Sequence, residues 1–289
     1  MTIEEKTIFF RGYQLHQLRL TPPADVPPRG AFIFFHGMGD YIDRYPTFLA
    51  EIVHLGFLIV LTDFPGHGQS GGARGDIPTV AFVDELVDSI EKTLPVDLPR
   101  GVCGHSMGGF LALHTYCRRP DRYQFAWFSS PLLDPIERTS PFMTRLLLAA
   151  SGFFPRFGWS TGVKPADCAP EIPPHLHEEV ATSLTPSLFH RRISLRWARA
   201  LVEISEDLWT AFPLVRRKEN PIPLLFTQGT ADPVCSPDTL DRFLANAPAT
   251  NCTLIPFPDA LHEPFRGPGL ADFSRAVANW IDTTLPPSS

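Results

Sequence analysis

Short runs of apolar residues alternate with amphipathic stretches along most of the chain. Residues 31–35 and 57–63 form almost continuous apolar runs, which are typical of strands buried on both faces. Between them, residues 45–56 carry apolar side chains at helical spacing and end at Gly56, a residue type favoured just beyond helix C-termini. These segments predict one strand–helix–strand unit.

The same alternation continues on both sides of one long interruption. Further strands are predicted at 100–104, 125–130, 223–229 and 252–258, and further helices at 79–94, 107–119, 236–247 and 270–285. Period-two alternation at 6–10 and 13–20 predicts an antiparallel hairpin ahead of them. Strands that alternate with helices indicate an α/β protein with a mostly parallel central sheet flanked by helices.

The interruption at 131–220 is rich in proline and aromatic residues and has little strand character. A structureless loop of that length is uncommon in a compact domain, so we expect an inserted helical cap. An insertion after a strand would lie over the carboxyl ends of the sheet, where α/β proteins bind ligands. The predicted division is a core formed by 1–130 and 221–289, with a cap at 131–220.

Composition narrows the class of protein. The chain has 289 residues, 44% of them apolar, which is enough for a large core. A net charge of −6, with no run of Lys or Arg, argues against a nucleic-acid partner. The five cysteines are widely spaced and form no C-x-x-C pair, which indicates free thiols. The pattern holds no signal for an oligomeric state.

The N-terminal segment is too polar for a secretory signal, and no apolar stretch approaches the roughly 18 residues of a membrane span. We therefore expect a cytoplasmic protein. Transient contact of the cap with a membrane surface, as a peripheral protein, is an additional hypothesis.

Ser106 lies between the strand predicted at 100–104 and the helix predicted at 107–119, in the sequence Gly-His-Ser-Met-Gly. A sharp strand-to-helix turn forces the serine into an unfavourable backbone conformation and brings its neighbours close together. The flanking glycines provide the necessary space. This context predicts a nucleophilic serine.

A serine hydroxyl needs a base to become nucleophilic at neutral pH, and the base needs an orienting carboxylate. His262 follows the last predicted strand and is the candidate base. The other histidines after Ser106 fall on the helix that leaves the turn or in the cap: His114, His175, His177 and His190. Asp232 directly follows the strand at 223–229 and is the candidate acid, with Asp134, after the strand at 125–130, as the rival.

The oxyanion of such a reaction is stabilised by two backbone N–H groups, one after the nucleophile and one after an earlier strand. Met107 and Met38 occupy those positions. We expect His36 to hold its loop by hydrogen bonds rather than to transfer protons. The pair His175 and His177 lacks acidic or thiol partners at zinc-site spacing, so neither a metal nor an organic cofactor is expected.

Five stretches together resemble the α/β-hydrolase superfamily, in particular the monoacylglycerol lipases and lysophospholipase-like serine hydrolases: FFHGMGDYIDRY, TDFPGHGQSGGARG, GHSMGG, FTQGTADPVC and ALHEPF. The resemblance implies the α/β-hydrolase fold, with Ser106 as nucleophile, Asp232 as acid and His262 as base. It also implies that the residues at Met38 and Met107 form the oxyanion hole. Asp63 and His67, in the second stretch, are expected to be structural.

The expected reaction is hydrolysis of a carboxylic ester of monoacylglycerol or lysophospholipid through an acyl-enzyme. A serine at the turn argues against a dehalogenase or an epoxide hydrolase, which use aspartate there. An esterase for small substrates, a thioesterase, a peptidase or a carbon–carbon bond hydrolase could use the same three residues. A non-enzymatic scaffold is the least supported alternative, because no member of the set is missing.

Residues 141–154 predict a cap helix that is apolar over more than half of its circumference. Such a helix either packs on the body of the protein, lines an acyl tunnel above Ser106 or rests on a lipid surface. The candidate substrate contacts on it are Phe142, Leu146, Leu147 and Phe154.

Overall fold

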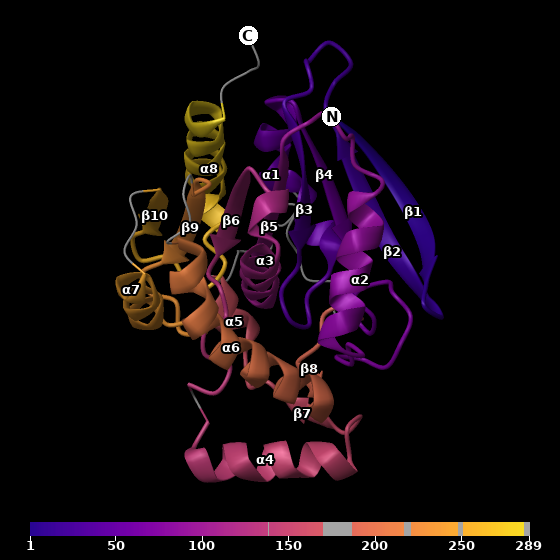
Figure 1. Cartoon of the computed structure of the whole chain (residues 1–289), viewed down its shortest axis with the longest axis vertical. Helices are drawn as coiled ribbons and strands as arrows, with labels where there is room; N and C mark the ends of the chain where they lie inside the picture. The colour runs from indigo at the N-terminus through magenta and orange to yellow at the C-terminus, as the bar shows by residue number, and fades with distance from the viewer. Residues whose placement is uncertain (138, 170–186, 217–220, 248–250, 286–289) are drawn as a thin grey trace.

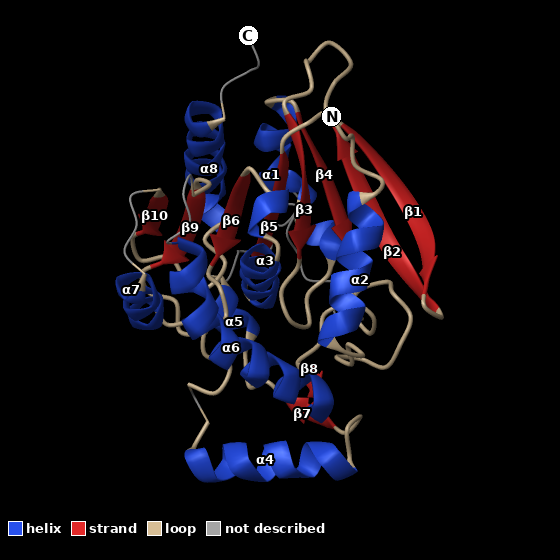
Figure 2. Cartoon of the chain, viewed as in Figure 1, coloured by secondary structure: helices blue, strands red, loops and turns tan. Residues whose placement is uncertain are grey.

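A computed structural model of the chain describes residues 1–137, 139–169, 187–216, 221–247 and 251–285. Its centre is an eight-stranded sheet in the order β1-β2-β4-β3-β5-β6-β9-β10 (Figures 1 and 2). The strands are β1 Thr2–Phe10, β2 Tyr13–Thr21, β3 Gly30–Phe35, β4 Phe57–Thr62, β5 Arg100–His105, β6 Phe125–Ser129, β9 Leu224–Gly229 and β10 Cys252–Phe257. Only the pairings of β1 with β2 and of β2 with β4 are antiparallel, so the predicted, mostly parallel sheet is confirmed.

Helices cover both faces of the sheet. Helices α1 (Pro46–His54) and α8 (Leu270–Thr284) pack on one face, and α2 (Val80–Glu91), α3 (Met107–Arg118) and α7 (Pro237–Asn246) pack on the other. Single turns of 3₁₀ helix lie at η1 Ile42–Arg44, η2 Pro120–Arg122 and η4 Gly267–Gly269. Because both faces are covered, every residue of β3 and β4 is buried, which is why these strands are almost continuously apolar in sequence.

The first strand differs from its prediction. β1 begins at Thr2 rather than near Lys6, because it pairs with β2 along its whole length, from Thr2 opposite Thr21 to Phe10 opposite Tyr13. Most of β1 is exposed at the edge of the sheet. Its polar first half therefore lacks the apolar alternation that reveals a strand in sequence, and charged residues there protect an open edge.

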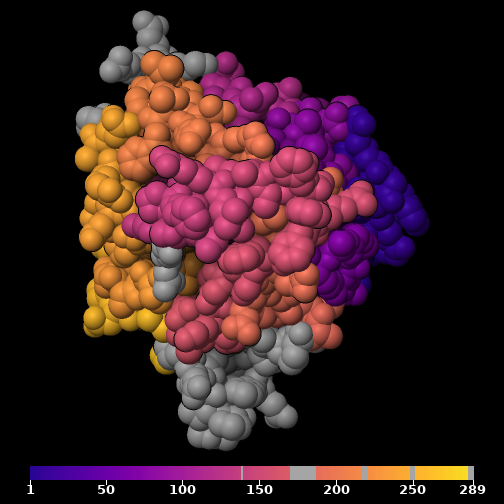
Figure 3. Space-filling view, turned by 90° about the horizontal axis from the view of Figure 1, so that it is seen from below, coloured from indigo at the N-terminus to yellow at the C-terminus, as the bar shows by residue number. Residues whose placement is uncertain are grey.

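The cap lies between β6 and β9, at the carboxyl ends of the parallel strands (Figure 1). It contains α4 Pro141–Phe153, β7 Gly158–Ser160, α5 Pro165–Cys168, β8 Arg192–Ser194 and α6 Leu195–Arg216. β7 and β8 form a small antiparallel pair that the sequence did not predict, because three residues are too few to show a period. Figure 3 shows the side chains of α4 spread across this face of the molecule. No described helix is both long and apolar enough to cross a bilayer.

Candidate active site

The turn at Ser106 joins β5 to α3 and holds the serine at φ 57° and ψ −122°, a backbone conformation that residues other than glycine rarely adopt. A Cβ atom added to Gly104 would lie 2.4 Å from the carbonyl carbon of Gly108. One added to Gly108 would lie 2.0 Å from the carbonyl oxygen of Phe35. Neither position can hold a side chain without moving backbone, which is the physical reason for the glycines around Ser106.

Three loops at the carboxyl edge of the sheet bring the predicted residues together. The Oγ of Ser106 lies 2.9 Å from Nε2 of His262, and Nδ1 of His262 lies 2.8 Å from Oδ2 of Asp232. All three side chains are buried. The rival acid, Asp134, lines the nearby cavity but accepts the N–H of Ile136 in its own turn.

The Asp232 carboxylate determines the proton positions on His262. Its Oδ1 accepts the backbone N–H groups of Val234 (2.7 Å) and Cys235 (3.0 Å). Because an ionised carboxylate only accepts hydrogen bonds, Nδ1 of His262 must donate to Oδ2. In the neutral ring, Nε2 then presents its lone pair to the hydroxyl of Ser106, as a general base requires.

Gln228, the penultimate residue of β9, was missed by the sequence reasoning. Its Nε2 donates to Oδ2 of Asp232 at 2.8 Å and lies 3.1 Å from the carbonyl oxygen of Cys235. It thereby holds the carboxylate facing His262. The only signal in the sequence is a pair of polar residues, Thr227 and Gln228, near the end of a strand that begins apolar, with Gln228 four positions before Asp232.

The pKa of His262 predicts an acidic limit to activity. Burial lowers this pKa, but the charge and hydrogen bond of Asp232 outweigh burial and raise it above the usual 6.5. Since the base must be neutral to accept a proton, kcat/KM for a soluble ester should rise with pH and reach half its maximum above pH 6.5. A pH–rate profile measures this midpoint. A midpoint clearly below 6.5 would contradict the assignment of His262 as the base.

Two backbone N–H groups next to Ser106 have no hydrogen-bond acceptor among the described residues: those of Met38 and Met107. Gly37 packs directly on the serine, since a Cβ atom there would lie 3.4 Å from the Cβ of Ser106. The side chain of Met107 points away into the core, where its sulfur accepts the indole N–H of Trp197 at 3.3 Å. Both amides are therefore free to donate to a developing oxyanion.

His36 and Asp63 brace the loops around these amides. Nδ1 of His36 lies 2.7 Å from the carbonyl oxygen of Gly37, and its Nε2 accepts the N–H of Phe64 at 3.0 Å. Burial lowers the pKa of His36 to about 4. The Asp63 carboxylate accepts the backbone N–H groups of Ile42 (2.8 Å) and Gln69 (2.9 Å), and burial raises its pKa to about 7.

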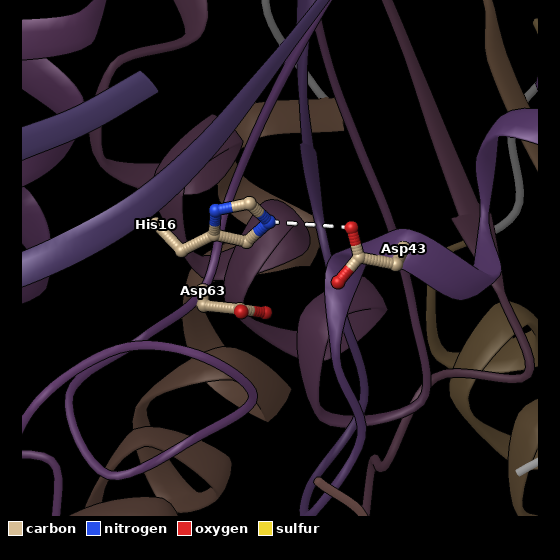
Figure 4. Close-up of side chains that lie close together, drawn as sticks. All are labelled: His16, Asp43 and Asp63. Atoms are coloured by element: carbon tan, nitrogen blue, oxygen red, sulfur yellow. Dashed lines mark hydrogen bonds and ion pairs between the residues drawn. The ribbon is translucent and has the colours of Figure 1, made fainter. Parts of the chain in front are cut away.

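Asp63 also belongs to a group of side chains that are common metal ligands. Figure 4 shows His16 from β2, Asp43 from η1 and Asp63 from the loop after β4 close to one another, with Nε2 of His16 3.2 Å from Oδ1 of Asp43. Both oxygens of Asp63 already accept backbone N–H groups, so the group ties β2, η1 and the loop after β4 together. The other candidate metal ligands, His175 and His177, lie outside the described residues.

A buried ionic network behind the site joins two loops: the one after β3, which carries Met38 (the Met38 loop), and the one after β10, which carries His262 (the His262 loop). The guanidinium of Arg44 contacts Oδ1 of Asp40 at 2.5 Å and both carboxylate oxygens of Glu263 at 3.2 and 2.8 Å. The hydroxyl of Tyr45 donates to Asp40 at 2.6 Å and lies 3.1 Å from the backbone nitrogen of Gly37, whose N–H it accepts. Burial alone would raise the pKa of Glu263, but the charges of Arg44 and Arg266 hold this pKa below its usual range. Sequence spacing gave no sign of this network, because Glu263 is 219 positions from its partner Arg44.

A cavity of about 610 Å³ separates the cap from Ser106. Of the four substrate contacts predicted at 141–154, only Leu147 lines it, with Met143, Thr144 and Leu148 from the same side of α4. Phe142, Leu146 and Phe154 do not line the cavity; they are exposed, Phe142 by 76%. The expectation for these three differs from the structure because α4 is apolar on nearly every side, so that its period does not distinguish the inner face from the outer.

Known proteins resemble the chain over most of its length. It is 26% identical to an uncharacterised abhydrolase domain-containing protein of Dictyostelium discoideum, over 89% of this chain but 26% of that one, so it spans about a quarter of that relative. It is 28% identical to a monoacylglycerol lipase of Mycolicibacterium smegmatis, over 90% of this chain and 91% of the other. The crystal structure of a monoacylglycerol lipase of Paleococcus ferrophilus superposes with a TM-score of 0.79 at 26% identity, covering 93% and 99% of the two chains.

The site geometry and these likenesses agree on the class of enzyme, a serine hydrolase that cleaves carboxylic esters. A family model described as serine aminopeptidase, S33, matches residues 26–268. This match includes the turn at Ser106, the loops that carry Met38, Asp232 and His262, and the cap. The chain therefore belongs to the serine aminopeptidase S33 family and has the α/β-hydrolase fold.

Proposed function

We propose that the protein hydrolyses monoacylglycerols or closely related single-chain lipid esters, with Ser106 as nucleophile, His262 as base and Asp232 as the orienting acid. The observation that carries the proposal is the hydrogen-bonded series from Asp232 through His262 to Ser106, which opens into a cavity lined by the inner face of α4. The monoacylglycerol lipases that resemble this chain support the same substrate class.

The proposed reaction uses only groups of this chain, the ester and water. His262 takes the proton of Ser106 as the hydroxyl oxygen attacks the ester carbonyl, and Asp232 stabilises the imidazolium. The N–H groups of Met38 and Met107 donate to the oxyanion of the tetrahedral intermediate. As this intermediate collapses, the alcohol leaves with the proton from His262. Water, activated by the same histidine, then hydrolyses the acyl-enzyme and releases the fatty acid.

The cavity wall supports an acyl chain as the group that is bound. Met143, Leu147 and Leu148 of α4 line the cavity together with Ile193 of β8 and Leu201 of α6. A chain that lies against this wall leaves water, and each buried methylene contributes up to about 0.8 kcal/mol. The binding energy of a longer acyl chain is thus available to lower the barrier of the reaction.

The outer side of the cap supports contact with a lipid surface. Phe142, Leu146 and Phe153 lie along one side of α4, and Phe153 is 82% exposed. Phe154 and Phe157, just beyond the helix, are exposed as well. An exposed apolar strip of this kind is typical of proteins that rest on a membrane interface. The five cysteines are free thiols, which favours a cytoplasmic location for that contact.

A chain-length series tests the substrate class. On soluble monoacyl esters, kcat/KM should rise as the acyl chain lengthens from two to about eight carbons, because each added methylene is buried against α4. Leu147→Asp, on the inner face, should flatten this rise, since it places a charge where the chain binds. Steady-state kinetics below the critical micelle concentration measures the slope.

A matched variant on the outer face separates the two sides of α4. Phe142→Asp should leave the chain-length slope unchanged and reduce cosedimentation with phospholipid vesicles, because Phe142 faces away from the cavity. A wild-type enzyme that prefers acetyl to octanoyl esters would rule out the lipid substrate and leave an esterase for small substrates.

A further inference from the structure

The cap contacts the loop that carries Met38 through one tight backbone junction. His190, two residues before β8, donates its N–H to the carbonyl oxygen of Gly39 at 2.9 Å. Gly39 has φ +72°, and a Cβ atom there would lie 1.8 Å from the carbonyl oxygen of His190. The cap backbone therefore lies against the residue next to Met38, with no room for any side chain at Gly39.

The ring of His190 anchors this junction to a third segment. Its Nε2 lies 3.0 Å from the carbonyl oxygen of Gly66, and its Nδ1 accepts the N–H of Arg192 at 3.2 Å. A carbonyl oxygen only accepts, so Nε2 carries the proton and the ring is neutral with both nitrogens bonded. Burial, together with the charge of Arg74, lowers the pKa of His190 to about 4, which keeps this state at neutral pH.

His190 is also the last of three imidazoles that lie in a row, with each ring tilted by 47° or 49° from the next. The ring centroids of His36 and His67 are 5.1 Å apart, and those of His67 and His190 are 4.8 Å apart. Nδ1 of His36 lies at the carbonyl oxygen of Gly37, and Nε2 of His67 lies 3.4 Å from the sulfur of Met38. The three histidines thus contact residues 37 to 39 from three segments: His36 follows β3, His67 lies in the loop after β4, and His190 belongs to the cap.

We propose that His190 is a positioning residue for the oxyanion hole: by holding Gly39 from the cap side, it sets the direction of the Met38 N–H. The inference rests on the proposed function, in which that N–H donates to the oxyanion. A hydrogen bond weakens steeply as its angle departs from linearity, so a small rotation of residues 37 to 39 would weaken the stabilisation of the transition state. His190 lines the same cavity as Ser106, but its ring bonds to Gly66 and Arg192, so we infer that its effect passes through the loop backbone.

Correct placement of the cap on the Met38 loop is then required for catalysis as well as for substrate binding. The other catalytic loop also rests on the cap, since the N–H of Glu263 donates to the carbonyl oxygen of Cys168 at 2.7 Å. A ligand or surface that displaces the cap would therefore disturb the Met38 loop on one side of Ser106 and the His262 loop on the other.

The test compares His190→Ala and His190→Gln with the wild-type enzyme on an octanoyl monoester. Removing one oxyanion donor outright costs about 10²–10³ in kcat, so misdirecting it through His190→Ala should lower kcat by about 10–100-fold. KM should stay within about twofold, because Met143, Leu147 and Leu148 of α4, which line the cavity together with His190, are unchanged. His190→Gln, whose side-chain amide can donate to Gly66, should restore most of kcat. Rates are divided by the concentration of active sites, titrated to completion with a fluorophosphonate, so that unfolded protein does not count.

Two inhibitors provide a readout that a purely structural role would not move. An octyl trifluoromethyl ketone adds to Ser106 and places an oxyanion at Met38, whereas an octyl glycerol ether only fills the cavity. His190→Ala should weaken the ketone by the same factor as kcat/KM and leave the ether unaffected, while His54→Ala, an exposed histidine at the end of α1, should change neither. Equal weakening of both inhibitors, or full activity in both His190 variants, would overturn the proposal. An inactive wild-type enzyme that the fluorophosphonate does not label would instead reject the proposed function itself.

Discussion

Replacing Ser106 with alanine is expected to lower ester turnover by about 10⁴-fold or more, the largest single effect that the structure predicts. The substitution keeps the Cβ atom and removes only the oxygen that lies 2.9 Å from Nε2 of His262. Without that oxygen there is no nucleophile, although the amides of Met38 and Met107 and the cavity remain. The fold should be retained, because the backbone of Ser106 keeps its bonds to Ser129 and Phe110.

Turnover of a soluble octanoyl ester, a thermal unfolding curve and mass spectrometry after reaction with an organophosphonate together check this prediction. Ser130 is a matched control, since it is also buried and also has a positive φ, of 41°. Ser130→Ala should retain activity, and the wild-type adduct should be found on Ser106 alone. An adduct on another serine would refute the assignment of the nucleophile.

Asp232→Asn should reduce turnover by about 10³–10⁴-fold through the protonation of His262. Oδ1 of Asp232 accepts two backbone N–H groups, so the oxygen of an asparagine has to stay on that side. Its NH₂ group then faces Nδ1 of His262 and donates to it. The imidazole proton moves to Nε2. This atom then directs an N–H group at Ser106 and can no longer accept the hydroxyl proton.

The rival aspartate is the control for this experiment. Asp134→Asn should change turnover little, because the Asp134 carboxylate bonds within its own turn and has no contact with His262. Steady-state kinetics on both variants decides between the two, and the reverse ranking would move the acid to the loop after β6. The same Asp232 variant should also lower the pH midpoint of any residual activity, since the charge that raises the pKa of His262 is lost.

The three central site residues were predictable because each depends on local signals. Glycines on both sides of Ser106 reflect a turn that leaves no room for side chains, and that requirement is readable within five residues. Asp232 and His262 each follow a strand of a parallel sheet, and parallel strands bring their carboxyl ends to one edge. The layered fold was predictable for a related reason, since strands covered on both faces have to be apolar throughout.

The supporting residues were not predictable, because their roles arise from contacts between distant parts of the chain. Gln228 has meaning only once β9 places it beside Asp232 and Cys235. Arg44 and Glu263 are 219 positions apart and meet only when the Met38 and His262 loops are packed together. No periodicity or spacing rule connects such pairs, and burial makes them strong without leaving a pattern in the sequence.

In the cap, too, one feature was predictable from sequence and another was not. Its helix at 141–153 was evident from the run of apolar side chains, but that run is so uniform that it could not say which side faces Ser106. Folding turned Leu147 toward the cavity and left Phe142 in solvent, because α6 packs against one side of α4 and nothing described covers the other. The spacing of apolar residues therefore determined which helices and strands form and how they are layered. Which side chains meet depended on the relative placement of whole elements, a property of the folded chain that adjacent residues do not encode.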